Sequence, residues 1–176
     1  MTPPSETFTP VLQFDSQCFS DSRGTFLKVF DAASSGLREF HPQQINYVQT
    51  PQKNTLRGLH YQLDEYAESK LFRVVKGAIQ LAWVDLRAVD SEISPPCGSV
   101  VLNKPASAIF VPRGFATGYL TLEPDTEVLY LSDNIYSPEH ERGLRWDDPT
   151  LHLNWIHRRP TVSEKDSAWP FLPSSC

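Results

Sequence analysis

The chain contains 176 residues, of which 40% are hydrophobic and 11% aromatic, and its formal net charge is −5. A chain of this length closes one sizeable hydrophobic core, so we expect a single domain over residues 1–176, with loosely ordered ends at about 1–10 and 170–176. The acidic balance excludes a general nucleic-acid-binding surface, because such a surface needs a basic excess to displace counterions from phosphates.

Cysteine usage and hydropathy favour a soluble protein of a reducing compartment. Cys18, Cys97 and Cys176 are widely spaced and odd in number, which predicts neither a disulfide framework nor a zinc site. No apolar run approaches the roughly 20 residues that a membrane-spanning helix needs, and residues 1–10 lack an apolar signal-peptide core. We therefore expect a cytoplasmic protein without membrane association.

Short apolar segments separated by turn residues recur along most of the chain, and this rhythm is typical of all-β proteins. Glycine, proline and aspartate supply the turn chemistry between the segments. In chain order the segments are 11–14, 25–30, 44–50, 55–62, 70–75, 78–86, 99–102, 108–112, 116–122 and 127–132. About ten such strands fit a jelly-roll or cupin-like barrel.

Three further features complete this reading of the fold. Residues 32–40 form the one helical candidate of any length, and it is a weak one. Residues 78–86 alternate between an apolar and a mixed face, which predicts a strand whose mixed face lines a cavity. From Ser137 onward the pattern becomes charged and proline-rich, and we expect an ordered tail that wraps the barrel.

The most informative segment is 55–62, which places a fixed cation and a titratable base close together within a strand. Side chains alternate faces in a regular strand, so Arg57 and His60 would point to opposite faces. Gly58 lies between them and permits a kink or bulge. We therefore expect an irregular strand that brings an anion clamp beside a proton-transfer base.

His60 is the leading candidate for a general base, because a neutral imidazole takes up and returns a proton near pH 7. The alternative is a structural histidine with satisfied hydrogen bonds. Metal binding is disfavoured because there is no His-x-His motif. The other histidines lie in polar or terminal stretches at His41, His140, His152 and His157.

Four further polar residues suit the same chemistry. A phenol such as Tyr130 can return a proton to a carbanion, although tyrosine in a barrel strand is by default a core residue. Lys70 could neutralise an enolate oxygen, or could lie in solvent at the start of its strand. Arg23 and Arg57 could clamp phosphate oxygens, with exposed ion pairs as the alternative.

Several large enzyme classes are excluded by missing motifs. The chain has no glycine-rich phosphate loop, no nucleophile elbow and no Cys–His arrangement. Kinases, dinucleotide-dependent enzymes and serine hydrolases are therefore out of contention.

Taken together, the ordered motifs of this chain resemble the dTDP-4-dehydrorhamnose 3,5-epimerase family from about Phe14 to Asp166. The matching segments cover most of the chain and occur in the family's order. They are 19–26, 44–46, 56–62, 70–77, 84–87, 111–116, 136–143, 146–149 and 163–166.

The resemblance implies a jelly-roll homodimer without cofactor or metal, acting on a nucleotide-diphospho-4-keto-6-deoxy sugar. It implies that His60 is the base, Asp166 the carboxylate paired with it, Lys70 the cation near the C4 oxygen and Tyr130 the acid. By the same resemblance, the nucleotide diphosphate is held by Arg57 and Arg23. The other positions expected to line the substrate site are Gln44, Asn46, Thr117, Tyr136, Glu141 and Lys165.

Two departures from the family pattern bear on the substrate. The family motif Gly-Phe-Ala-His-Gly-Phe reads Gly-Phe-Ala-Thr-Gly-Tyr in this chain, so Thr117 stands in place of a second histidine. Lys28 stands where relatives usually carry glutamate. Three readings stay open: a C3 and C5 epimerase, a single-centre epimerase of a GDP- or CDP-linked 4-keto sugar, and a non-catalytic sugar-nucleotide-binding protein.

Overall fold

The computed structural model describes residues 10–33, 35, 37–88 and 94–172. Its secondary structure is almost entirely strand. The strands are β1 (Leu12–Asp15), β2 (Cys18–Asp21), β3 (Gly24–Leu27), β4 (Gln44–Thr50), β5 (Thr55–Gln62), β6 (Lys70–Lys76), β7 (Ile79–Asp85), β8 (Cys97–Leu102), β9 (Ser107–Val111), β10 (Phe115–Thr121), β11 (Thr126–Ser132), β12 (Glu141–Gly143) and β13 (Thr161–Val162). The helices are short: η1 (Asp64–Tyr66), η2 (Leu86–Ala88), η3 (Pro149–Leu151) and α1 (Glu164–Ser167).

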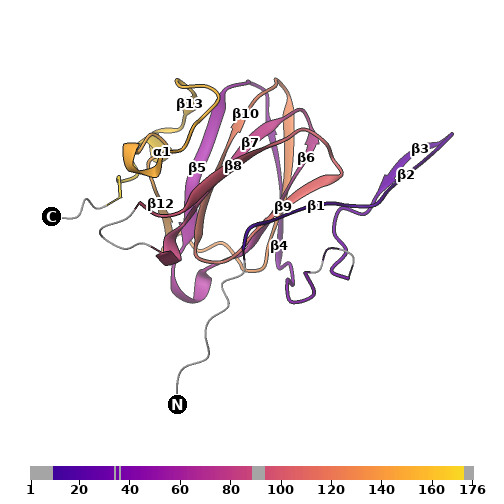
Figure 1. Ribbon diagram of the computed structural model, residues 1–176, viewed down its shortest axis with the longest axis horizontal. Helices are drawn as coiled ribbons and strands as arrows, with labels where there is room; N and C mark the ends of the chain where they lie inside the picture. Colours follow the sequence, from indigo (N-terminus) through magenta and orange to yellow (C-terminus); the bar gives the residue numbers. More distant parts are fainter. Residues whose placement is uncertain (1–9, 34, 36, 89–93, 173–176) are drawn as a thin grey trace, which may run out of the picture.

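Two antiparallel sheets enclose the core (Figure 1). One sheet has the order β1-β9-β6-β11-β4, and the other has the order β12-β5-β10-β7-β8, with β13 added in parallel on β5. Side chains of both inner faces interdigitate, including Phe72, Ile79, Leu81, Ile109 and Val128. These residues alternate with outward-facing neighbours along their strands, which is the periodicity that a two-sheet barrel requires. The expected all-β barrel is confirmed.

The expected strands agree closely with the observed ones in the centre of the chain. Residues 44–50 and 55–62 coincide with β4 and β5, and most other boundaries differ by one or two residues. The hairpin strand β2 and the short strands β12 and β13 were not anticipated. Each of them is only two to four residues long, too short to display a periodic pattern.

The expectation of a helix at 32–40 is wrong, because the described residues of this segment form turns and bends. The Asp31 carboxylate accepts a hydrogen bond from the Ala33 backbone N–H, which favours a turn over a continuing helix. Leu37 and Phe40 are buried against Leu71, Phe110 and Leu131, on the outer face of the first sheet. Their apolar spacing therefore reflects packing of a loop rather than a helical face.

The mixed face of β7 also differs from expectation, since it does not line a cavity. Gln80 is buried, and its side-chain amide donates to the Asn154 carbonyl at 2.8 Å and accepts from the Ile156 N–H, also at 2.8 Å. The C-terminal segment therefore covers this face of the strand. Polar side chains on a buried strand face are stable here because their hydrogen bonds are satisfied.

Residues 138–172 lie against the barrel, as expected of a wrapping tail, and two short strands of this segment pair with β5. β12 pairs with β5 in antiparallel register, and β13 pairs with its other end in parallel register. Residues 170–172 are tied down as well: the Leu172 N–H donates to Asp148 at 2.6 Å, and Arg145 stacks over Phe171. The remaining terminal residues, 1–9 and 173–176, lie outside the described part of the chain.

The hairpin formed by β2 and β3 is a separate two-stranded sheet that projects from the barrel (Figure 1). Its base is held by Arg73, which is buried and donates hydrogen bonds to the carbonyls of Val29, Pro105 and Ala106. A buried guanidinium that serves several carbonyls from different segments holds them together. Within the described residues, no helix is long and apolar enough to cross a membrane.

Candidate active site

A bulge in β5 determines the geometry of the site. Thr117 lies opposite His60 whereas Tyr119 lies opposite Arg57, so the register between β5 and β10 shifts. Gly58 has φ +112°, and a Cβ there would lie 2.6 Å from the Gly118 Cα. Only glycine fits such a close crossing of two backbones. As the sequence predicts, this irregularity turns Arg57 and His60 toward the same cavity.

The cavity lies between the two sheets and has a volume of about 430 Å³. Four of the expected catalytic side chains converge on it, together with an apolar wall from Val48 and Phe72. Expected site residues that line it are Arg57, His60, Lys70, Thr117, Tyr130, Lys165 and Asp166. A concave site with a few converging polar groups is the common form of a small-molecule site.

His60 and Asp166 form a hydrogen-bonded pair, with 2.6 Å between the imidazole Nε2 and the carboxylate Oδ1. The other carboxylate oxygen accepts from the Gly58 backbone N–H at 3.0 Å. Ser163 caps α1 by accepting from the Asp166 N–H, and this cap sets the position of Asp166 on the short helix. Burial raises the pKa of Asp166, but the hydrogen bond and charge of His60 outweigh it and lower that pKa overall.

Lys70 and Tyr130 lie on neighbouring strands of the opposite sheet. The Lys70 ammonium is 2.9 Å from the Glu68 carboxylate, and both side chains are nearly buried. The Tyr130 ring stacks on Phe72 with 5.4 Å between ring centroids. Burial, reinforced by the charge of Glu68, raises the pKa of Tyr130. The phenol therefore stays protonated at neutral pH and is available as a proton donor.

A smaller pocket of about 90 Å³ adjoins the cavity and shares His60, Lys70 and Tyr130 with it. Gln44, Tyr136 and Glu141 line this second pocket. The Glu141 carboxylate accepts from the Tyr136 hydroxyl at 2.6 Å and from the Lys165 ammonium at 2.5 Å. Burial raises the pKa of Glu141, but these hydrogen bonds outweigh it and the pKa is lowered.

Asn46 and Thr117 complete the expected set near the two pockets. Asn46 lies opposite Tyr130 in the β4–β11 register and accepts from the Gln44 side chain at 2.9 Å. Its amide nitrogen is buried without a hydrogen-bond partner among the described residues. Thr117 is buried in β10, directly opposite His60. A threonine hydroxyl there can exchange hydrogen bonds but cannot carry a charge.

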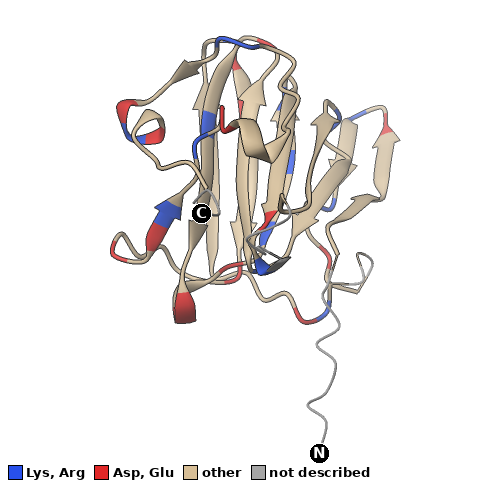
Figure 2. Ribbon diagram, turned by 60° about the vertical axis from the view of Figure 1, so that its left-hand side comes forward, with Lys and Arg blue, Asp and Glu red and all other residues tan. Residues whose placement is uncertain are grey.

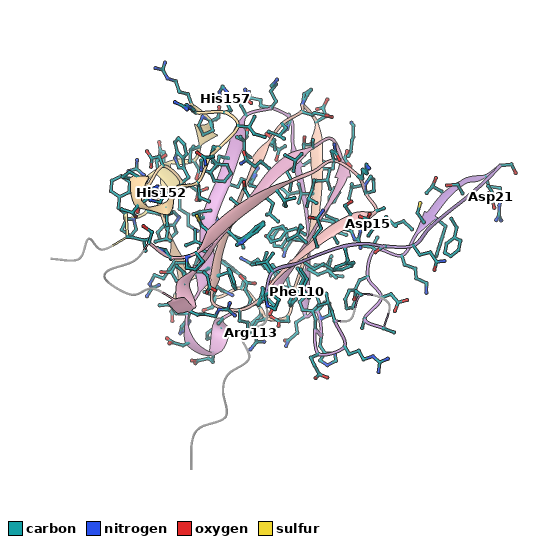
Figure 3. The ribbon with its side chains drawn as sticks, viewed as in Figure 1. Asp15, Asp21, Phe110, Arg113, His152 and His157 are labelled. Atoms are coloured by element: carbon teal, nitrogen blue, oxygen red, sulfur yellow. The ribbon has the colours of Figure 1, made fainter. Side chains whose placement is uncertain are left out.

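Arg23 is the expected site residue that the structure places elsewhere. It lies at the turn of the β2–β3 hairpin, with its side chain 88% exposed and paired with Asp21 at 2.6 Å. Figure 3 shows Asp21 at the far tip of the projecting hairpin. Within a single chain, Arg23 therefore does not line the cavity.

Metal ligation finds no support in the arrangement of the described residues, where no group of three or more His, Cys, Asp or Glu side chains could hold an ion. His152 and His157 lie on the C-terminal segment over the second sheet (Figure 3). His140 stacks on Tyr66 instead, with 4.2 Å between ring centroids. These three histidines therefore lie at separate places among the described residues.

Two neighbours of the expected site were missed in the sequence. Glu68 precedes Lys70 by two residues, and this spacing within an extended segment was the available signal for their pairing. Trp169 packs its indole edge against the His60 imidazole, with 6.2 Å between ring centroids. Nothing local to its sequence position indicates this contact, because strand pairing brings the two residues together.

Residues 6–174 match the family model described as dTDP-4-dehydrorhamnose 3,5-epimerase. The chain belongs to this family. The dTDP-4-dehydrorhamnose 3,5-epimerase of Sinorhizobium fredii is 38% identical over 88% of this chain and 80% of its own length. The enzyme of the same name from Shigella flexneri is 35% identical over 89% of this chain and 87% of its own length.

Solved structures of the family share the fold over nearly the whole chain. The Bacillus anthracis dTDP-4-dehydrorhamnose 3,5-epimerase, with TDP and PPi bound, has a TM-score of 0.86 at 32% identity and covers 94% of this chain and 96% of its own. The Legionella pneumophila dTDP-6-deoxy-D-glucose-3,5-epimerase, in complex with dTDP-4-keto-L-rhamnose, has a TM-score of 0.82 at 28% identity and covers 92% and 87%. The jelly-roll expectation and the family resemblance are both confirmed.

Proposed function

We propose that this protein is an epimerase that inverts C3 and C5 of a nucleotide-diphospho-4-keto-6-deoxy sugar, with dTDP as the nucleotide. The observation that carries the proposal is the convergence of a His–Asp pair, a lysine and a buried tyrosine on one cavity. The family's enzymes bear the same activity in their names. A protein that only bound its ligand would need neither a His–Asp pair as a proton acceptor nor a buried tyrosine as a proton donor.

Proton abstraction by His60 is the first step. The ketone at C4 acidifies the hydrogens at C3 and C5, because the electrons of the broken C–H bond delocalise onto the C4 oxygen as an enolate. The imidazole Nε2 is bonded to Asp166, which leaves Nδ1 to accept the proton. Asp166 holds the ring and stabilises the imidazolium that forms.

Enolate stabilisation and reprotonation complete the inversion. The Lys70 ammonium offsets the negative charge that develops on the C4 oxygen. Tyr130 donates its phenolic proton to the same carbon from the face opposite His60. The C4 carbonyl forms again, and the reprotonated carbon has the inverted configuration. His60 then releases its proton to solvent and Tyr130 regains one, and the same steps at the second carbon invert that centre as well.

The nucleotide diphosphate occupies the cationic part of the cavity in this proposal. Arg57 lines the cavity and lies outside the ion pairs formed among the described residues. A guanidinium holds phosphate oxygens through two parallel hydrogen bonds. Lys165 adds a second cation on the same cavity. The smaller pocket, with Gln44, Tyr136 and Glu141, receives another part of the substrate.

Solvent exchange tests the reaction directly. The protein is incubated in heavy water with dTDP-4-keto-6-deoxyglucose, and proton and carbon NMR follow deuterium at C3 and C5. Incorporation at both carbons with inverted product supports the proposal. Exchange at one carbon alone, or only with GDP- or CDP-linked sugars, would replace it with a single-centre or different-nucleotide epimerase, and binding without exchange would leave a non-catalytic protein.

We also propose that the protein acts as a homodimer in which the β2–β3 hairpin packs against the partner. An isolated two-stranded hairpin is only marginally stable, and this one exposes Phe19 and Phe26 at 49% and 62%. A second copy would cover these rings. The hairpin would then carry Arg23 toward the partner's cavity, where a phosphate-binding arginine has a role.

Subunit mixing tests this assembly. Arg23→Ala and His60→Ala variants are purified separately, then mixed under conditions that exchange subunits. If Arg23 serves the partner's site, each mixed dimer contains one intact site of two, and because random exchange makes half of the dimers mixed, the mixture gains about a quarter of the wild-type activity. Full activity of Arg23→Ala alone would place Arg23 outside the site, no recovery in a mixture shown to contain mixed dimers would show that it does not serve the partner's site, and a monomer by light scattering refutes the assembly.

A further inference from the structure

Trp169 lies beside the His60–Asp166 pair and has no role in the reaction described above. It follows α1 by two residues, and its ring meets the imidazole edge-on, with 6.2 Å between centroids and 71° between planes. The Lys165 ammonium lies 5.8 Å from the centroid of the same indole. The indole therefore contacts His60 and also Lys165, which precedes Asp166 in the chain.

The position of the indole depends on a glycine in the adjacent strand β12. Gly143 lies opposite His60 in the β12–β5 pairing, and a Cβ at Gly143 would lie 2.5 Å from the Trp169 Cδ2, Cε2 and Nε1 atoms. Such a contact is far shorter than carbon atoms tolerate. The absence of a side chain at Gly143 is thus what allows the indole to reach the back of the imidazole.

The indole N–H is buried and makes no hydrogen bond with any described residue. A buried donor without a partner is costly, so such a group in a native site calls for an explanation. Burial raises the pKa of Asp166, while His60, the Gly58 N–H and, more weakly, the Trp169 N–H lower it. The indole N–H therefore faces the carboxylate closely enough to interact with its charge.

Other charged groups surround the pair, and the role of Trp169 has to be distinguished from theirs. Arg57 shares β5 with His60, and Lys165 precedes Asp166 on α1. Glu141 on β12 interacts with the charge of His60. Lys70 and Tyr130 face the pair across the cavity from β6 and β11.

We propose that Trp169 is a positioning residue for the base: its ring holds the imidazole of His60 in place, and its N–H forms a third hydrogen bond to Asp166 during the catalytic cycle. This inference rests on the proposed function, since it assigns a role within the same site. The third donor limits how strongly Asp166 attracts the proton carried by His60. The pair can then return to its neutral-imidazole state between the two inversions.

The test compares Trp169→Phe with the wild type, because phenylalanine keeps an aromatic ring and removes the N–H. Without the indole donor, Asp166 stabilises the imidazolium more strongly. We expect the acidic limb of the kcat/KM pH profile to move upward by about half a unit, and kcat to fall on the order of tenfold. The KM is expected to change less than about twofold, since a phenyl ring at this position keeps the contact with Lys165 and Arg57 is unaltered.

Trp155→Phe is the matched control. The Trp155 indole N–H donates to the Trp146 carbonyl at 2.9 Å, in the core behind the second sheet. This substitution also removes one indole N–H, but at a place away from His60. We expect it to lower the thermal stability and to leave the pH profile of kcat/KM unmoved. A Trp169→Phe enzyme with an unmoved acidic limb, whatever its overall activity, would refute the proposed role.

A measurement on the wild-type protein keeps the inference testable if Trp169→Phe does not fold. The indole N–H signals of the four tryptophans are resolved by ¹⁵N NMR and assigned through Trp155→Phe and similar single variants. The Trp169 signal is expected to titrate together with the imidazole of His60, and an unresponsive signal would refute the inference. Absence of exchange by the wild type with every 4-keto sugar would refute the proposed function instead, and this titration would still test the contact.

Discussion

At the scale of single residues, catalysis depends on how His60 is held. Its Nε2 is bonded to a carboxylate that is itself fixed by the Gly58 N–H and by the cap of α1. A base oriented in this way spends little conformational freedom in reaching the substrate. In the mechanism that we propose, the pair rather than the imidazole alone is the catalytic unit.

Substitution of either member of the pair separates the base from its support. His60→Ala is expected to abolish deuterium exchange at both carbons, because no other group on the cavity replaces the imidazole. Asp166→Asn is expected to lower the rate between tenfold and ten-thousandfold while nucleotide affinity stays nearly unchanged. Exchange is measured by NMR and affinity by calorimetry, and wild-type exchange in His60→Ala would overturn the assignment.

Tyr130 is assigned to the second half of the reaction, and its removal should uncouple the two halves. Tyr130→Phe keeps the ring stacked on Phe72 but removes the proton donor. We expect deuterium to enter the starting sugar while little inverted product forms. Inversion at the wild-type rate would show that another group, such as Tyr136 or a water molecule, is the acid.

At the scale of elements, the site depends on the crossing of β5 and β10. The Gly58 backbone has φ +112°, and a Cβ there would meet the Gly118 Cα at 2.6 Å and the Thr117 carbonyl at 2.7 Å. Both contacts are with backbone, which cannot rotate away. The crossing produces the bulge that brings Arg57 and His60 to the same side.

Gly58→Ala should therefore destabilise the fold and distort the site together. We expect the free energy of unfolding to fall by roughly 2 kcal/mol or more, with loss of activity in the protein that remains folded. Gly24→Ala is the control, because Gly24 also has a positive φ, +132°, but has nothing within 4 Å of the added Cβ. Chemical denaturation of both variants separates the strain from the clash, and equal stability losses would contradict the packing argument.

At the scale of the whole molecule, an acidic protein has to capture an anionic substrate. The net charge is −5, and Figure 2 shows acidic residues spread over the loops and strand ends. On the cavity, however, Arg57 lies outside the ion pairs of the described residues, whereas Lys70 and Lys165 pair with Glu68 and Glu141. A local cationic site attracts phosphates even when the overall charge opposes them.

Salt should weaken substrate capture through these cations. We expect the KM of the wild type to rise as ionic strength increases from about 0.01 M to 0.15 M, because screening shortens the range of the attraction. Arg57→Ala is expected to raise the KM and reduce its salt dependence, with a smaller effect on kcat. Lys104→Ala removes an equal charge from the loop between β8 and β9 and should leave both unchanged; an unaltered KM in Arg57→Ala would place the phosphates elsewhere.

Much of this architecture could be predicted from local pattern. Short apolar segments bounded by turn residues at 44–50 and 55–62 predicted the strands β4 and β5, because such a pattern is a property of consecutive residues. Gly58 between Arg57 and His60 indicated the bulge for the same local reason. The helix expected at 32–40 failed, because the burial of Leu37 and Phe40 in a loop outweighed a weak helical pattern.

Local pattern predicted the all-β barrel and the irregular strand that carries Arg57 and His60, and the ordered motifs identified the family. The fold decides which side chains meet: His60 and Asp166 are 106 residues apart in the chain, and Trp169 reaches His60 because β13, which α1 and Trp169 follow, pairs with β5. It also removed Arg23 from the cavity of its own chain. The physical reason is that contacts between distant residues depend on strand order and register, which the whole core decides and no local pattern contains.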